Sequence, residues 1–164
     1  MTSRILFTGL IMAATAAHAA VASAQTVKHI QTPNSQIATA VWVGDTLYVS
    51  GQLPSPATPA DRGRGTAAAW GNTQMQAENT FRKIEAILKE QGLAMGDIVM
   101  MRVYMVADPA MENRLDFAGM NAAYAKFFGT AEQPNKPARS TVQVAALVTQ
   151  GALLEIEVQA ARHK

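Results

Sequence analysis

The sequence has no cysteine, and this absence removes several chemistries at once. Disulfide bonds, thiol catalysis, Cys-ligated metals and lipid attachment to a leader cysteine are all excluded. Histidine is scarce as well, because only His29 and His163 follow the first 24 residues. Neither has a neighbour at metal-ligand spacing, so we expect no metal site and no serine–histidine–aspartate triad.

Charge is also sparse, with 14 Lys and Arg against 12 Asp and Glu in 164 residues. The basic residues are scattered, so the sequence predicts no nucleic-acid partner. No Walker loop is present, and "GRGTAA" (63–68) follows a proline-rich loop, residues 54–72, where a dinucleotide fingerprint requires a strand. We therefore expect no cofactor. With 49% hydrophobic residues, the composition is that of a globular domain.

The first 24 residues have the three parts of a secretory signal peptide. A short positive start is followed by an uncharged apolar stretch, residues 5–17, and by Ala22-Ser23-Ala24, an A-x-A cleavage signal. An uncleaved membrane anchor and an earlier cleavage after Ala19 remain alternatives. We expect a signal peptide at residues 1–24 and a single domain at 25–164. The mature protein would then be periplasmic or secreted, with no membrane part.

Hydrophobic periodicity predicts the elements of the remaining chain. Apolar residues at a 3.6-residue spacing indicate helices over residues 73–91 and 111–128. Alternating or β-branched runs indicate a hairpin over 37–52 and strands over 97–106, 140–147 and 152–161. The order ββαβαββ predicts an α+β domain, in which two helices pack on one face of a mixed sheet.

One arginine stands at the entrance of an otherwise apolar strand. Arg139 precedes the predicted strand 140–147, and Thr141 shares its side by the two-residue period. A guanidinium binds a carboxylate bidentately and stays charged at any relevant pH. Glu155 on the following strand could face the same space. Solvated surface roles for Arg139 and Glu155 remain the alternative at this point.

Four segments in the right order resemble the Rid family, the YjgF-type reactive-intermediate deaminases. They cover nearly all of the expected mature chain. The segments are "LYVSGQLP" (47–54), "QAENTFRKIEAILKEQGLAMGDIVMMRVYM" (76–105), "DFAGMNAAYAKFFG" (116–129) and "PARSTVQVAAL…GALLEIEVQA" (137–160).

The resemblance implies a chorismate-mutase-like fold and a homotrimer whose clefts lie between subunits. It implies hydrolysis of reactive 2-imino and enamine acids, such as 2-aminoacrylate, to 2-keto acids and ammonia. It also implies that neither a cofactor nor a metal is needed. A small imino or keto acid would be the ligand.

The resemblance also assigns site residues. The essential arginine of the family falls on Arg139, the cleft glutamate on Glu155, the helix asparagine on Asn121 and the ligand-facing glycine on Gly51, which follows Ser50. Asn121 could instead only brace its helix.

Two positions depart from the family pattern. Thr141 stands where members often carry cysteine, and Ile37 stands where they usually carry a cleft tyrosine. We expect both residues at the ligand, and the change at Ile37 to affect substrate preference more than reaction type. Two other functions remain open. One is a non-catalytic trimer that binds small carboxylates, and the other is a surface-interaction or holdase-like protein in which Arg139 is dispensable.

Overall fold

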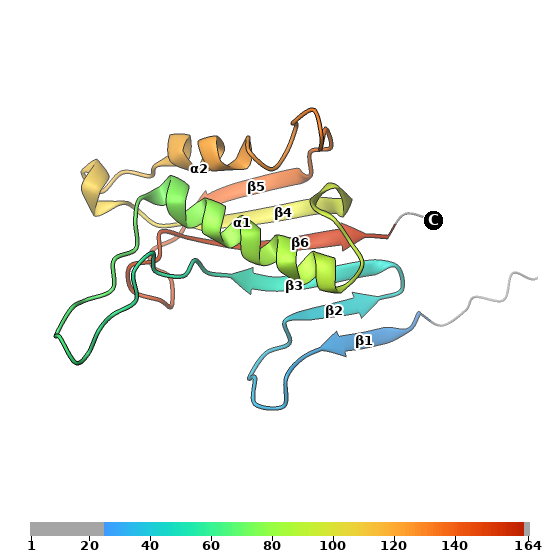
Figure 1. Cartoon of the computed structure of the whole chain (residues 1–164). Helices are drawn as coiled ribbons and strands as arrows, with labels where there is room; N and C mark the ends of the chain where they lie inside the picture. The colour runs from blue at the N-terminus through green and yellow to red at the C-terminus, as the bar shows by residue number, and fades with distance from the viewer. Residues whose placement is uncertain (1–24, 163–164) are drawn as a thin grey trace, which may run out of the picture.

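The structure, a computed structural model, describes residues 25–162 (Figure 1). The expected signal peptide and His163 lie outside the described residues. The strands are β1 (Val27–Ile30), β2 (Ala40–Val43), β3 (Thr46–Gln52), β4 (Ile98–Met105), β5 (Ala138–Gln143) and β6 (Leu154–Ala161). The α-helices are α1 (Thr73–Glu90) and α2 (Phe117–Tyr124), and short 3-10 turns η1 (Met95–Asp97) and η2 (Pro109–Met111) precede β4 and follow it.

The strands form one mixed sheet in the order β1-β2-β3-β6-β4-β5. Only β4 and β5 run parallel, and every other neighbouring pair is antiparallel. The predicted α+β class with a mixed sheet is therefore confirmed. The structure adds β1, an edge strand that the sequence did not reveal. Its four residues "VKHI" are mostly exposed, so they carry no buried alternation to signal a strand.

Both helices cover the same face of the sheet, as predicted (Figure 1). Asn72 caps the start of helix α1, because its side chain accepts a hydrogen bond from the Met75 amide, and Gly92 follows the end of the helix with a φ of +74°. Its inward side chains pack against alternate residues of the central strands. The largest fully buried side chains of this core are Phe81, Leu47, Ile84, Leu88, Met101, Met105, Met120, Leu154 and Ile156.

The second helix is shorter than predicted. The expected helix 111–128 is interrupted because Glu112 and Asn113 adopt left-handed backbone conformations, with φ of 57° and 56°. The α-helix begins only at Phe117, where the Asp116 side chain accepts a hydrogen bond from the Gly119 amide. Past Tyr124 the chain continues in turns. Apolar periodicity alone does not detect these local backbone choices.

Strand β5 begins two residues earlier than predicted, at Ala138 instead of Ser140. Parallel pairing with β4 sets Met101 beside Arg139 and Val103 beside Thr141. Arg139 therefore lies inside the strand ladder and not at its entrance. The strand also ends earlier, at Gln143, because the chain then leaves the sheet to form the turn before β6.

Residues 54–72 form a narrow arm that projects from the body (Figure 1). Isolated bridges join Thr58 to Ala69 and Asp61 to Thr66 along the arm. Arg64, near the tip, is 86% exposed and pairs with Asp61 at 3.6 Å. Arg64, the arginine of "GRGTAA", is thus solvent-facing.

Two features that bear on function are absent from residues 25–162. In this part of the chain no helix is both long and apolar enough to cross a bilayer. In the same residues no three His, Asp or Glu side chains gather where they could hold a metal ion.

Candidate active site

Arg139 is held in one orientation by helix α2. Its Nη2 donates a hydrogen bond of 2.9 Å to Oδ1 of Asn121. Its Cζ lies 4.6 Å from the ring centroid of Tyr124 and 5.7 Å from that of Phe117. A guanidinium on the faces of aromatic rings gains a favourable interaction with the ring quadrupole. The charge is therefore fixed in position before any ligand arrives.

Two polar atoms beside this anchor have no partner. Within residues 25–162, Nη1 of Arg139 and Oγ1 of Thr141 are buried and make no hydrogen bond. Both side chains point to the helix-covered side of β5, because their paired residues Met101 and Val103 are buried there. An unpaired buried polar group costs roughly 1–3 kcal/mol. A bound carboxylate or water would satisfy both atoms. Arg139, Thr141 and Asn121 are called the arginine cluster below.

The environment of this cluster also acts on Tyr124. Burial raises the pKa of its phenol, and the nearby Arg139 charge offsets part of that rise. The ring is therefore neutral at physiological pH and serves as a flat support. Phe117, in contrast, is 44% exposed and extends the aromatic surface toward solvent. The cluster thus joins a fixed cation to an apolar wall.

Glu155 lies with Gly51 in a second group. A β-bulge interrupts the pairing of β3 with β6 between Val49 and Gln52, and it includes Gly51. A Cβ added to Gly51 would overlap Oε1 of Glu155 and lie 2.9 Å from its Cδ. In the described part of the chain, the Glu155 carboxylate has no hydrogen-bond or ion-pair partner, so it is available to a ligand or a water molecule.

Ser50 precedes Gly51 in the chain, and hydrogen bonds join it to the segment that follows Ile37. The Ser50 hydroxyl donates a 2.7 Å hydrogen bond to the carbonyl of Ala38, the residue that follows Ile37. The Ser50 amide donates to the carbonyl of Thr39 at 3.1 Å. Ile37 itself is 67% exposed, which is unusual for isoleucine in a folded domain. Glu155, Gly51, Ser50 and Ile37 are called the glutamate cluster below.

The two clusters lie on opposite faces of the sheet. Glu155 pairs with Tyr104, whereas Arg139 pairs with Met101, and alternate residues of β4 face opposite sides. Strand β4 also lies between β5 and β6. The expectation that Glu155 shares a space with Arg139 and Thr141 is therefore wrong for a single chain. The two-residue period shows which residues of one strand share a face. Only the pairing of β5 and β6 with β4 shows whether residues of these two strands share a face.

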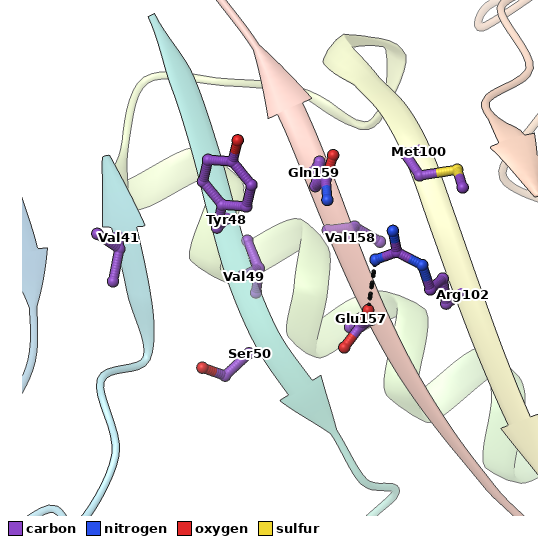
Figure 2. Close-up of a pocket in the computed structure, with 9 residues that line it drawn as sticks. All are labelled: Val41, Tyr48, Val49, Ser50, Met100, Arg102, Glu157, Val158 and Gln159. Atoms are coloured by element: carbon purple, nitrogen blue, oxygen red, sulfur yellow. Dashed lines mark hydrogen bonds and ion pairs between the residues drawn. The ribbon is translucent and has the colours of Figure 1, made fainter. Parts of the chain in front are cut away.

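The face of the sheet that the helices leave uncovered is hollowed, and both polar and apolar side chains line the hollow (Figure 2). Nη1 of Arg102 donates a 2.6 Å hydrogen bond to Oε1 of Glu157 across β4 and β6. Burial is the main cause that raises the pKa of Tyr104, followed by the Glu157 charge. The side chains that line the hollow are Val41, Tyr48, Val49, Ser50, Met100, Arg102, Glu157, Val158 and Gln159.

With this fold and site in place, the family of the chain follows from comparison with known proteins. The family model described as endoribonuclease L-PSP matches residues 26–162. The chain belongs to this family, which includes the YjgF and RutC proteins. The resemblance read from the four sequence segments is thereby confirmed at the level of the family.

Curated relatives agree with this membership. A RutC family protein of Haemophilus influenzae is 37% identical over 127 residues, covering 75% of this chain and 84% of that protein. An Escherichia coli protein is 36% identical over 124 residues, covering 73% of this chain and 81% of its own length. It carries the provisional name reactive intermediate deaminase TdcF.

Solved structures share the fold. A Pseudomonas aeruginosa protein of unknown function is 29% identical with a TM-score of 0.66, and the match covers 84% of this chain and 93% of that one. A YjgF family member from Neisseria meningitidis is 20% identical with a TM-score of 0.64, and the match covers 87% and 99%. The YjgF-type fold, expected from the sequence, is confirmed.

Three aromatic residues at these clusters were not identified from the sequence as site residues. Phe117 and Tyr124 occupy α2 on either side of Asn121, at the four- and three-residue spacings that place them on one helix face with it. Tyr104 has a weaker signal, since only the strand pairing brings it beside Glu155. The helical spacing could have identified the first two residues, and nothing local could have identified the third.

Proposed function

We propose that this protein hydrolyses reactive 2-imino and enamine acids to 2-keto acids and ammonia. The supporting observation is the arginine cluster, in which Asn121 and two aromatic rings hold Arg139 while its Nη1 and the Thr141 hydroxyl stay unpaired. This arrangement suits one carboxylate of a small acid. The E. coli relative named as a deaminase supports the same reaction class.

The site is proposed to form between copies of the chain, in a homotrimer. Within one copy the sheet separates Arg139 from Glu155, since their paired residues on β4 face opposite sides. A cleft that contains both residues requires the arginine cluster of one copy to meet the glutamate cluster of another. Exposed apolar side chains at both clusters, Phe117 and Ile37, are consistent with such burial.

The chemistry then needs only side chains and water. Arg139 binds the substrate carboxylate, and the Thr141 hydroxyl donates a second hydrogen bond to it. A water molecule beside the Gly51 backbone attacks the C=N carbon, and Glu155 accepts one of its protons. The C=N electron pair moves to nitrogen, which takes up a proton. The resulting carbinolamine collapses as its C–N bond breaks: Glu155 returns its proton to the departing nitrogen, the hydroxyl loses its proton as the C=O bond forms, and ammonia and the keto acid leave. Orientation provides most of the acceleration, since these substrates already react with water.

The test compares wild type with Arg139→Ala and Arg139→Lys. Imino acids are generated in situ by an amino-acid oxidase with catalase present, and the keto acid is trapped with semicarbazide. We expect both variants to lose turnover because lysine cannot form the bidentate contact. Arg64→Ala, on the exposed arm, is the matched control and should behave as wild type. Full activity of either Arg139 variant refutes the proposal.

The alternative of a non-catalytic carboxylate-binding trimer rests on the exposed Ile37, which lacks the hydroxyl that members usually have there. In that case calorimetry shows saturable binding of pyruvate that requires Arg139, while wild type releases no extra keto acid. The family description also names an endoribonuclease. We propose no nucleic-acid substrate, and incubation with labelled single-stranded RNA should leave the RNA intact.

The location of the protein is proposed from residues 1–24 alone. Their signal-peptide pattern favours export to the periplasm or the exterior, followed by cleavage after Ala24. Mass spectrometry of the protein purified from a bacterial periplasmic fraction should find an N-terminus at Gln25. Recovery of the full-length chain from the cytoplasm or a membrane fraction contradicts this proposal.

A further inference from the structure

Tyr104 stands directly opposite Glu155 in the antiparallel pair of β4 and β6. Directly paired residues of an antiparallel ladder have Cβ atoms roughly 4.5–5.5 Å apart on the same face. Tyr104 is half-buried, and the helices lie on the other face of the sheet. One face therefore presents a carboxylate and a phenol side by side.

Glu155 and Glu157 both lie near Tyr104, but they differ in their charged partners. The Glu157 charge acts on the Tyr104 phenol, and Glu157 is also paired with Arg102 at 2.6 Å. Glu155 has no such partner among the described residues. The paired residue on β5 is Val142, which cannot titrate. Glu157 is thus paired with Arg102, whereas Glu155 stays free to act as a base.

The phenol is a proton donor at physiological pH. Burial and the Glu157 charge raise its pKa above the ordinary value for tyrosine, and Arg102 offsets only part of this rise. A tyrosine in this state is almost fully protonated near pH 7. Hydrolysis of an imine needs such a donor, because the nitrogen must gain protons as water adds and as ammonia leaves.

We propose that Tyr104 is a further catalytic residue, the acid that works with Glu155 as base; this inference rests on the proposed deaminase function. As water adds to the C=N carbon, Glu155 takes a water proton and the phenol gives its proton to the nitrogen. The roles then reverse. Glu155 returns its proton to the departing nitrogen as the C–N bond breaks, and the tyrosinate takes the hydroxyl proton as the C=O bond forms. Both residues end in their starting states.

The test is Tyr104→Phe, which removes only the hydroxyl. The kcat for keto-acid release should fall at least about tenfold, the lower limit for loss of a general acid, with KM within about twofold. Small buffer acids should restore kcat in proportion to their concentration in this variant and have no effect on wild type. Tyr48→Phe, an exposed tyrosine on the same face, is the matched control and should retain wild-type kcat.

Each other outcome overturns part of the assignment. A kcat of Tyr104→Phe within twofold of an active wild type rejects the catalytic role and leaves the deaminase function intact. A loss of kcat that no buffer acid restores also rejects it, because a purely structural defect does not respond to added acid. Absence of Arg139-dependent turnover in wild type rejects the deaminase function, and this inference with it.

Discussion

The carboxylate of Glu155 lies against the Cα of Gly51, in the space that a side chain at position 51 would need. The β-bulge that contains Gly51 bends β3 at the point where it passes β6. Only glycine leaves room for the Glu155 side chain at this crossing. The requirement is steric, since the φ of Gly51 lies outside the positive region.

Gly51→Ala should therefore displace Glu155 and lower both stability and activity. Because the overlapping atoms are the flexible end of the Glu155 side chain, the cost in unfolding free energy should be at the low end for over-packing, about 1 kcal/mol. In a Glu155→Ala background the same change should cost much less, because the clashing carboxyl is gone. Urea unfolding of the four proteins gives the coupling energy. Gly63→Ala, where the nearest atom would be 3.4 Å away, is the matched control. Equal costs in both backgrounds would contradict the steric explanation.

The separation of Arg139 from Glu155 by the sheet makes subunit mixing informative. Arg139→Ala and Glu155→Gln should each be nearly inactive alone. Unfolded together and refolded as mixed trimers, they should regain activity, because some clefts then combine an intact arginine with an intact glutamate. Keto-acid release after co-refolding measures this recovery. A mixture as inactive as its components would contradict a site shared between copies.

Asn121 should affect substrate binding more than the chemical step. Its Oδ1 accepts the hydrogen bond from Arg139 Nη2, so Asn121→Ala frees the guanidinium and should raise KM. Asn121→Asp should raise KM further, since a carboxylate at 2.9 Å pairs with the guanidinium and competes with the substrate. Steady-state kinetics on one imino acid tests whether KM rises in the order wild type, Asn121→Ala, Asn121→Asp. An unchanged KM in both variants would show that Asn121 only braces its helix.

A pH-dependent contact links helix α1 to the turn that follows α2. Glu78 of α1 accepts hydrogen bonds from Lys126 at 2.5 Å and from Gln74 at 2.9 Å. The Lys126 bond is the largest cause that lowers the pKa of Glu78 below 4.5, and the Gln74 bond adds to it. Because the pKa of Glu78 is lowered in the folded state, the stability that these hydrogen bonds contribute is fully present above about pH 4.5. It is lost as pH falls through the pKa of Glu78 in the folded protein.

Glu78→Gln should therefore lower the melting temperature at pH 7 and have little effect near pH 3. Differential scanning calorimetry at both values tests this difference. Glu85→Gln, on the same helix, is the control, because Glu85 is exposed and forms no ion pair within residues 25–162. A loss of equal size at both pH values would show that packing, and not charge, dominates at Glu78.

Much of the fold could be predicted from residue patterns. The turn at Gly44, the alternation of β6 and the periodicity of α1 are local signals, and each element formed near its expected bounds. The predicted bounds were wrong where local backbone conformation or strand pairing overrode the residue pattern. The left-handed conformation of Glu112 shortened the second helix, and pairing with β4 extended β5 to Ala138.

By itself, the sequence determined the α+β class, the family segments and the seven candidate residues, because these depend on residue type, spacing and order along the chain. Only the tertiary structure decided which of those residues lie on the same face of the sheet. Strand order places β4 between β5 and β6, and register then assigns Arg139 and Glu155 to opposite faces. Register arises from long-range pairing between segments, so no local pattern around Arg139 or Glu155 contains it.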